Sequence, residues 1–258
     1  MIRLTFLGTG TSTGVPQIGC NCSVCRSNDT RDKRLRCSAL VQFDNGVNIL
    51  VDCGPDFRTQ ILRLGSPKID ALLITHSHYD HVGGIDDLRP YCTDRDFPLY
   101  CKSDVADDLR SRNPWSFKAN PYPGVPTFDI HEIDPDEPFY ISGVKVTPLP
   151  VMHASLPILG FRFGPLAYIT DCKTMPDNTL DKLVGIDTLV INALRHDEHM
   201  SHMSLSEALE IVKEIKPRRA YFTHMSHQIG KHADIILPSP ARLAYDGLSI
   251  TVINDRID

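Results

Sequence analysis

The chain has 258 residues, of which 41% are hydrophobic and 23% charged, the composition of a globular protein that can bury a sizeable core. This composition excludes a disordered chain and a fibre. The 32 acidic residues outnumber the 27 basic ones, and the net charge of −5 is not the basic excess expected of a sequence-independent nucleic-acid binder. The longest apolar runs are strand-sized, so we predict no membrane crossing.

The start of the chain has neither the basic leader nor the long apolar centre of a signal peptide, and we therefore expect a cytoplasmic protein. Its 8 cysteines are too sparse for a disulfide scaffold. Three of them crowd into residues 20–25, and in a cytosolic chain such crowding favours a metal site.

Short apolar runs, many of them bounded by Gly, Pro or Asn, predict a strand-rich chain. The predicted strands are residues 2–7, 39–43, 47–51, 71–74, 144–151, 160–163, 188–191, 220–222 and 248–252. Residues 103–112 predict a helix, which is followed by a Pro- and Asn-rich surface loop over 113–126. A more regular helix is predicted over 205–215, because a capping box of Ser204 and Glu207 begins it and a proline follows its end.

Strands with interspersed helices predict two packed sheets that are covered by helices. The chain has no internal repeat and no low-complexity tract that would mark a linker. We therefore expect a single domain over residues 1–258.

A dense group of potential metal ligands directly follows the predicted strand 71–74. The four residues are His76, His78, Asp80 and His81. Imidazole and carboxylate groups together suit zinc, manganese or iron. Because three of the 11 histidines of the chain lie in this short segment, a metal site is favoured over a solvated polar loop. Such ligands can face one pocket only if the backbone turns, and Gly83 and Gly84 offer the freedom for that turn.

The order His-x-His-x-Asp-His after an apolar strand resembles the metallo-β-lactamase superfamily, and the resemblance extends across nearly the whole chain. That superfamily carries further ligands at later strand ends, and the matching residues here are His153, Asp171 and His224. Asp52 matches the aspartate that supports the ligand loop. The resemblance implies an α/β fold, a four-layer αββα sandwich, with a small zinc-binding lobe near residues 15–37.

The resemblance also implies two divalent ions in the active site, zinc or manganese, with iron as a further candidate. The implied ligands form two sets that Asp171 bridges: His76, His78 and His153 for one ion, and Asp80, His81 and His224 for the other. A hydroxide held between two such ions is a nucleophile at neutral pH, so the implied reaction is hydrolysis. Asp80 counts among the implied catalytic residues as well as among the ligands.

The details of the motif indicate the substrate class. True β-lactamases carry a cysteine where Asp171 lies, which disfavours lactam cleavage. The opening segment 6–16 resembles the glycine-rich loop shared by the tRNA 3′-processing nuclease and the PhnP-type phosphodiesterase of the carbon–phosphorus lyase pathway. The nuclease carries a long arm between the positions matching His153 and Asp171, where only seventeen residues intervene here, and the resemblance is therefore closer to the PhnP type.

The cysteine cluster resembles the structural zinc site of the PhnP group. Its implied ligands are Cys20, Cys22, Cys25 and His227, the last of which lies three residues beyond His224. A closed Cys₃His set stabilises a fold and leaves no position open for chemistry. Cys37 and His232 are the reserve fourth ligands, and three reduced thiols in a loop are the alternative.

His202 matches the segment in which phosphodiesterase relatives keep a histidine that donates a proton to the leaving oxygen. It lies just before the capped start of the helix 205–215, where backbone N–H groups and the helix dipole favour a phosphate. His196 and His199 are expected to be exposed loop residues.

The predicted function is metal-dependent hydrolysis of a small phosphate ester, with a cyclic diester as the first choice. We expect no membrane partner and no nucleic acid beyond cyclic nucleotides, and a homodimer is left open. One alternative is an RNA-processing nuclease of the tRNA 3′-processing type, with a basic patch built from residues 33–36 or 218–219. The other is a non-catalytic metal-stabilised binding protein, which has no need of a proton donor such as His202.

Overall fold

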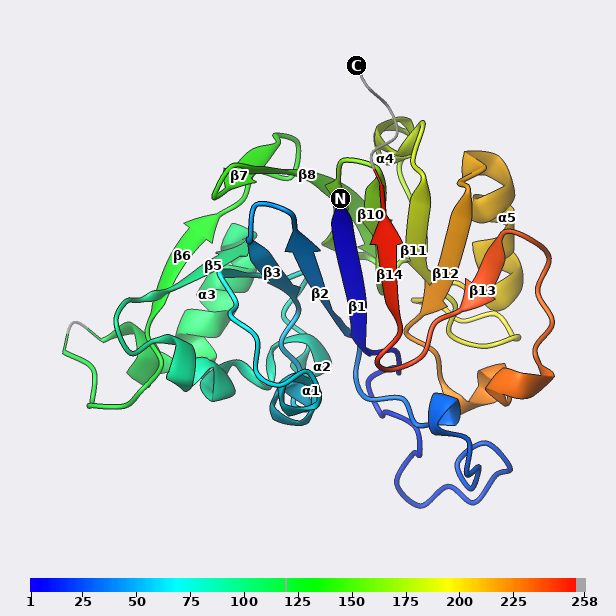
Figure 1. Cartoon of the computed structure of the whole chain (residues 1–258), viewed down its shortest axis with the longest axis horizontal. Coiled ribbons are helices and arrows are strands. Elements are labelled where there is room, and N and C mark those ends of the chain that lie inside the picture. The colour runs from blue at the N-terminus through cyan, green and yellow to red at the C-terminus, as the bar shows by residue number, and fades with distance from the viewer. Residues whose placement is uncertain (119, 254–258) are drawn as a thin grey trace.

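The computed structural model describes residues 1–118 and 120–253 and contains two seven-stranded sheets packed face to face (Figure 1). In spatial order the first sheet consists of β14 (Ser249–Val252), β1 (Ile2–Gly8), β2 (Ser38–Phe43), β3 (Asn48–Val51), β4 (Ala71–Leu73), β5 (Phe97–Cys101) and β6 (Phe128–Glu132). The second consists of β13 (Ala241–Leu243), β12 (Arg219–Thr223), β11 (Thr188–Asn192), β10 (Leu166–Tyr168), β9 (Leu156–Phe163), β8 (Val144–His153) and β7 (Phe139–Ile141).

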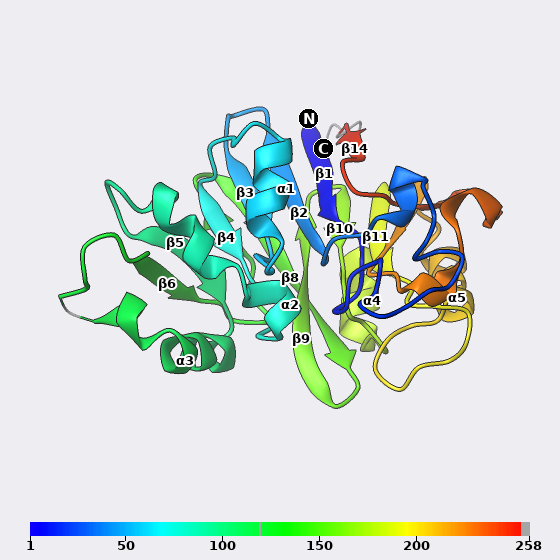
Figure 2. The ribbon, with the colours of Figure 1, turned by 90° about the horizontal axis from the view of Figure 1, so that it is seen from below.

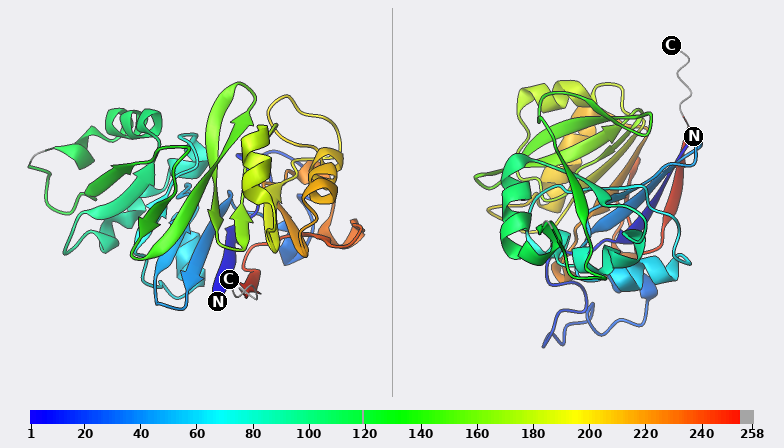
Figure 3. Two further views of the ribbon diagram at one scale, coloured as in Figure 1. Left: turned by 90° about the horizontal axis from the view of Figure 1, so that it is seen from above. Right: turned by 90° about the vertical axis from the view of Figure 1, so that its left-hand side faces the viewer.

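Helices cover the outer face of each sheet, which makes the four-layer αββα sandwich that the sequence predicts (Figure 3). The helices α1 (Phe57–Arg63), α2 (Tyr79–Val82) and α3 (Ser103–Arg112) belong to the first sheet, and α4 (Asp177–Leu183) and α5 (Leu205–Ile215) to the second. The 3₁₀ helices are η1 (Thr30–Asp32), η2 (Ile85–Tyr91), η3 (Pro114–Phe117), η4 (His227–Ile229) and η5 (His232–Asp234). None of the helices in the described residues has the length and apolar character needed to cross a membrane.

Both faces of the sheets are buried, because alternate side chains of a strand enter different cores. Val41 and Ile49 point into the core between the sheets, whereas their neighbours Leu40 and Leu50 pack against the outer helices. This arrangement explains why the central strands read as continuous apolar runs instead of alternating ones.

The strand directions bring the ends of two parallel sets to one edge of the sandwich. β3, β4 and β5 run parallel in the first sheet, and β10, β11 and β12 run parallel in the second. Parallel strands place the loops after their carboxyl ends side by side, which is where ligand sites of such sheets are found. Figure 2 faces this edge, with α2 near its centre and the lobe of residues 15–37 beside it.

Every predicted strand is present, and both predicted helices begin and end within one residue of prediction. The capping box of α5 is formed by Ser204 and Glu207 as predicted. β5, β6, β7 and β13 and the helices α1, α2 and α4 were not predicted, and β10 was implied only by the resemblance, as the strand before Asp171. The predicted loop 113–126 contains the turn η3, and its residue 119 lies outside the described residues.

Candidate metal centre

The predicted ligands come together at the edge where the parallel strands end. The ligand loop follows β4 and turns into α2, His153 ends β8, Asp171 follows β10, and His224 follows β12. Their ligand atoms fall into two groups, in each of which all atoms lie within 4.8 Å of one another. The two groups are His76, His78 and His153, and Asp80, His81, Asp171 and His224.

The hydrogen bonds of the first group leave ring nitrogens aimed at a common point. Thr75 Oγ1 donates to Asp52 Oδ2 (2.9 Å) and therefore accepts from His76 Nδ1 (2.9 Å), so His76 Nε2 carries a lone pair. That Nε2 faces His78 Nδ1 at 3.0 Å. His153 Nδ1 donates to the carbonyl of Ser201 (2.8 Å), which leaves its Nε2 as a ligand atom.

The second group is centred on His81. Its Nδ1 donates to Asp52 Oδ2 (2.7 Å), and its buried Nε2 has no hydrogen-bond partner among the described residues. This Nε2 lies 3.2 Å from Asp80 Oδ2 and 3.3 Å from Asp171 Oδ2. Asp52 thus fixes the ring orientation and tautomer of His81, the support role that the resemblance implied for it.

The electrostatics of the second group fit a bound cation. Asp52, Asp80 and Asp171 are all buried, and buried carboxylates require compensating positive charge. Burial opposes a charge on His81, yet the carboxylates of Asp171, Asp52 and Asp80 raise its pKa well above the usual value. Burial also lowers the pKa of His76 well below its usual value, and a neutral ring is the form that binds metal.

Backbone conformation at this edge is unusual for residues other than glycine. Asp52, Asp171 and His224 have φ values of 60°, 56° and 54°. This left-handed conformation is costly for a residue with a Cβ atom, and such residues cluster at functional sites. It turns the chain sharply at the strand ends.

The two glycines after the ligand loop have a different role from the one predicted. Gly83 (φ −65°) and Gly84 (φ −105°) adopt ordinary backbone conformations, and α2 itself makes the turn. Gly84 is required by close packing, because a Cβ there would lie 2.1 Å from the carbonyl oxygen of Gly54. A Cβ at Gly54 would in turn lie 2.0 Å from the carbonyl oxygen of Asp80.

Three threonines that contact the ligands were not singled out in the sequence. Thr75 bonds to Asp52, Thr170 Oγ1 donates to Asp171 Oδ2 (2.5 Å), and Thr11 Oγ1 contacts His224 Nε2 (3.2 Å). A signal for Thr75 and Thr170 exists, because the residue before a ligand is threonine in Thr75-His76, Thr170-Asp171 and Thr223-His224. Thr11 belongs to the glycine-rich loop, which therefore reaches the site.

His202 lies against both groups. Its Nδ1 is buried without a hydrogen-bond partner, 3.6 Å from Asp171 Oδ1, and its ring stacks on that of His224 with 4.9 Å between centroids. Burial lowers its pKa to about 3, so the ring is neutral in the absence of substrate. A bound phosphate would favour the protonated form, because a nearby negative charge raises the pKa of an imidazole. The proton-donor role stays a prediction.

The predicted anion site at the start of α5 is not formed. Leu205 N donates to the carbonyl of Arg195 (2.8 Å), and Glu207 N donates to Ser204 Oγ. The carboxylate of Glu207 occupies the same helix end and pairs with Lys173. The N–H groups of Leu205 and Glu207 are therefore in use, and the carboxylate of Glu207 supplies the negative charge that a phosphate would have provided.

The cysteine cluster assembles with His227 as the resemblance implied. The ligand atoms of Cys20, Cys22, Cys25 and His227 lie within 4.8 Å of one another. The backbone N–H of Cys25 is the main cause that lowers the pKa of Cys22 to about 6, which favours the thiolate that binds zinc.

The reserve ligands lie elsewhere. The thiol of Cys37 is buried against the hydroxyls of Tyr168 (3.2 Å) and Thr223 (3.3 Å), and the ring of His232 packs on Tyr245. His196 is exposed as expected, whereas His199 is half-buried with its ring 5.2 Å from that of His202.

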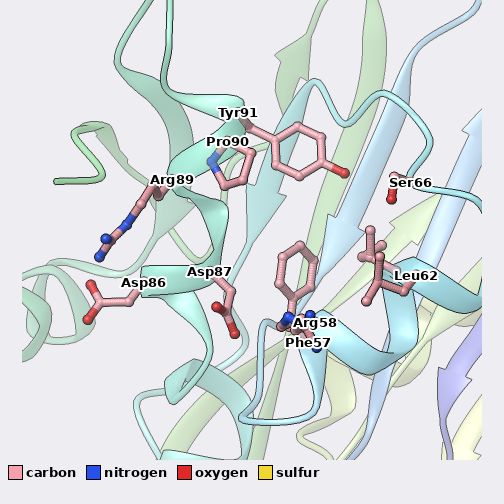
Figure 4. Close-up of a pocket in the computed structure, with 10 residues that line it drawn as sticks. Phe57, Arg58, Leu62, Ser66, Asp86, Asp87, Arg89, Pro90 and Tyr91 are labelled. Atoms are coloured by element: carbon pink, nitrogen blue, oxygen red, sulfur yellow. The ribbon is translucent and has the colours of Figure 1, made fainter. Parts of the chain in front are cut away.

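A pocket of about 620 Å³ opens on the outside of the first sheet, between α1 and η2 (Figure 4). Phe57 and Tyr91 line it, with Arg58 and Asp87 among its charged groups. None of its lining residues belongs to the predicted ligand sets. The candidate site is therefore defined by its ligands and not by the volume of a cavity.

Comparison with known proteins places the chain in a family. Residues 47–225 match a beta-lactamase superfamily domain. An octanoyltransferase from Porphyromonas gingivalis is 43% identical over 254 residues, which are 97% of this chain and 52% of that protein. The chain thus spans about half the length of this relative.

Two solved structures are similar over almost the whole chain. A diphosphatase of the PhnP family has a TM-score of 0.90 and 39% sequence identity, with 98% of each chain covered. Zn(2+)-bound PqqB from Methylobacterium extorquens has a TM-score of 0.78 and 21% identity, with 97% of this chain and 100% of that chain covered. The second likeness concerns the fold alone.

Proposed function

Because the chain belongs to the beta-lactamase superfamily, we propose that it is a metal-dependent hydrolase whose substrate is a small phosphodiester, with cyclic esters as the first candidates. The observation that carries the proposal is the position of Asp171, whose carboxylate faces His81, His224 and His202 in one buried site. A carboxylate at this point, in place of a thiolate, makes a ligand set of nitrogen and oxygen donors. Such a set suits zinc, manganese or iron.

The ligands would hold two ions. Two bound divalent ions supply an activated water molecule at neutral pH and neutralise charge on a phosphoryl group. The chain itself contributes orientation, since Asp52 and Thr75 fix the rings of His81 and His76. It also contributes exclusion of water, since Asp80, His81, Asp171 and His224 are buried.

His202 is the residue that we propose as the proton donor to the leaving oxygen. Its ring lies beside Asp171 and His224 and belongs to neither of the two main ligand groups. It is grouped only with its neighbours His153 and Asp171. A residue that flanks the reacting centre without being needed for a metal ion can exchange a proton with substrate.

Most of the residues predicted to build the basic patch of a nuclease are buried or paired with a carboxylate. Arg34 is buried, and Arg36 pairs with Asp56. Arg218 and Arg219 both pair with Asp187. These ion pairs reduce the positive charge that would attract an RNA backbone, and they support a small substrate.

Octanoyl transfer is a second candidate because of the name of the Porphyromonas relative. The match covers about half of that protein, so the named activity can belong to either half. The buried ligand groups in the matched half favour hydrolysis. The chain should therefore be assayed with an octanoyl thioester alongside the phosphate esters.

The test is a substrate panel with metal-loaded protein. It contains 2′,3′-cyclic AMP, bis(p-nitrophenyl) phosphate, the monoester p-nitrophenyl phosphate, a precursor tRNA and an octanoyl thioester. We expect hydrolysis of the diesters that chelation abolishes and that zinc or manganese restores. Cleavage of the precursor tRNA or of the thioester alone, with both small diesters untouched, would overturn the proposal.

A further inference from the structure

One turn of the chain connects the two metal-ligand clusters. His224 of the catalytic group and His227 of the cysteine cluster are three residues apart, and the backbone of Met225 between them bonds to Thr9 and Thr11 of the glycine-rich loop. His224 is held at a φ of 54°, so the conformation of this turn decides where its ring lies. Whatever fixes the turn therefore fixes a ligand of each cluster.

Arg34 is a buried side chain that bonds to this turn. Its guanidinium donates to the carbonyl of Ser226 (2.9 Å) and to the carbonyl of Gly230 (3.0 Å), which lie on either side of His227. The backbone of Arg34 pairs with Val15 in both directions at 2.8 Å. The same residue thus ties the lobe that carries the cysteines to the turn that carries both histidines.

The environment of Arg34 indicates a dedicated role. Its side chain has no exposed surface, and its counter-ion Asp32 is 1% exposed and lies 3.4 Å away. Asp32 in turn accepts from the backbone N–H of His232 (2.7 Å), beyond the same turn. Burying an ion pair costs several kcal/mol per ion before its interactions compensate, so a buried pair is weak support for stability by itself.

We propose that Arg34 is a positioning residue that couples the cysteine cluster to the catalytic group, by holding the turn 224–227 between them. Metal bound by the cysteines and His227 would then stabilise the position of His224. Loss of that metal would weaken the catalytic group without touching any of its ligands. The proposal concerns metal affinity and does not depend on which substrate is hydrolysed.

The neighbouring ion pair provides a matched control. Arg31 lies two residues after Asp29, as Arg34 lies two residues after Asp32, and both pairs belong to the same lobe. The side chain of Arg31 is 42% exposed, and its hydrogen bonds go to Asp29 alone. Arg31→Lys and Arg34→Lys therefore make the same chemical change, but only the second removes contacts with Ser226 and Gly230.

The experiment measures two metal affinities on the full chain, by titration of metal-free protein with zinc in competition with a chromophoric chelator. We expect Arg34→Lys to weaken zinc at the cysteine cluster and at least one of the two catalytic ions by about tenfold or more, the usual effect of losing a supporting contact to a ligand. Arg31→Lys should change neither. Asp32→Asn keeps the guanidinium and its two bonds to the carbonyls. Its zinc affinities should lie between those of the two arginine variants, and it replaces Arg34→Lys in the experiment if that variant does not fold.

Two outcomes would overturn the proposal. If Arg34→Lys weakened zinc at the cysteine cluster while both catalytic ions bound as in the original protein, Arg34 would support the lobe alone. If neither affinity changed, the turn would be fixed by its backbone contacts with Thr9 and Thr11. Failure of the proposed phosphodiesterase activity would leave all of these measurements interpretable, since none of them uses a substrate.

Discussion

Asp171 is the residue at which the two ligand groups meet, and its replacement is the most direct test of the metal centre. Asp171→Asn keeps the size of the side chain but removes the charge that faces His81 and His224. We expect activity to fall to the level of the metal-free protein, because Asp171 is the residue proposed to bridge the two ions. Elemental analysis should find the labile ions depleted while the zinc of the cysteine cluster remains.

The control for this variant is Asp187→Asn. Asp187 is a partly exposed aspartate that pairs with Arg218 and Arg219 before β11. The Asp187→Asn protein should retain its activity and its metal content. Near-normal turnover in Asp171→Asn would remove the two-ion site from consideration.

His202 separates proton transfer from metal binding. Since it lies beside Asp171 but outside the two main ligand groups, His202→Ala should keep its metals and lose about 10²–10⁴-fold in rate. The loss should be large with 2′,3′-cyclic AMP, whose alkoxide leaving group needs a proton. It should be much smaller with bis(p-nitrophenyl) phosphate, whose leaving group is stable as an anion.

The contrast between these two substrates distinguishes the roles open to His202. Equal losses on both would show that His202 orients the phosphate group. An accompanying loss of metal would show that it acts as a ligand with His153 and Asp171, the third cluster that the structure brings together. Full activity on both would leave the half-buried His199 as the neighbouring donor.

At the scale of secondary-structure elements, the sequence predicts most reliably where local signals and burial agree. The capped helix α5 and the central strands, which are apolar on both faces, were predicted with nearly correct bounds. β6 (Phe128–Glu132) was not, because it is an edge strand whose buried Phe128 is followed by mainly exposed polar residues. The helix α2 could not be predicted from periodicity, since its few residues are dictated by the ligands they carry.

The residues of the candidate site likewise divide into those that a local sequence pattern identifies and those that only the packing of the chain reveals. Ligands with a characteristic spacing, such as His76, His78 and His81, were identified from the sequence alone. Gly54 was not, because its role is a close approach to Asp80 that only the packing of two loops creates. The buried role of Arg34 was likewise invisible, since in the sequence it reads as one of several surface cations.

Asp246 connects elements that are distant in the sequence. Its buried carboxylate accepts from the backbone N–H groups of Thr9 (2.9 Å) and Leu35 (2.8 Å), and it lies before β14. Burial raises its pKa from 3.8 to about 6, so folding favours the protonated carboxyl. The stability that this preference contributes is complete below about pH 4 and is lost as the pH rises through about 6.

The asparagine variant isolates this effect. Asp246→Asn does not ionise, so the free energy of unfolding of the original protein should fall relative to the variant by about 2 kcal/mol between pH 4 and pH 6. Chemical denaturation of both proteins across this range measures the difference. Loss of metal at low pH affects both proteins and cancels. A constant difference would show that Asp246 does not titrate there.

At the scale of the whole molecule, the lobe of residues 15–37 differs from the sandwich in how it is stabilised. Its own buried hydrophobic cluster consists of Val15, Val24 and Cys25, and its one regular element is the turn η1. A core of this size cannot offset the conformational entropy of ordering the lobe, and small units of this kind depend on a metal or on disulfides. The sandwich has three large hydrophobic cores.

Loss of the zinc should therefore unfold the lobe while the sheets persist. Cys22→Ser removes the thiol nearest to His227 (3.3 Å) and should reduce the metal content from three ions per chain to two or fewer. Hydrogen exchange followed by mass spectrometry should show rapid exchange over residues 17–33 and the turn 226–232, with slow exchange retained in β1, β2 and β11. Cys92→Ser, which changes a half-buried cysteine outside the cluster, should leave both measurements unaltered. Unchanged zinc content and exchange in Cys22→Ser would refute the structural zinc site, and exchange that accelerated equally in lobe and sheets would show that the metal stabilises the sandwich as a whole.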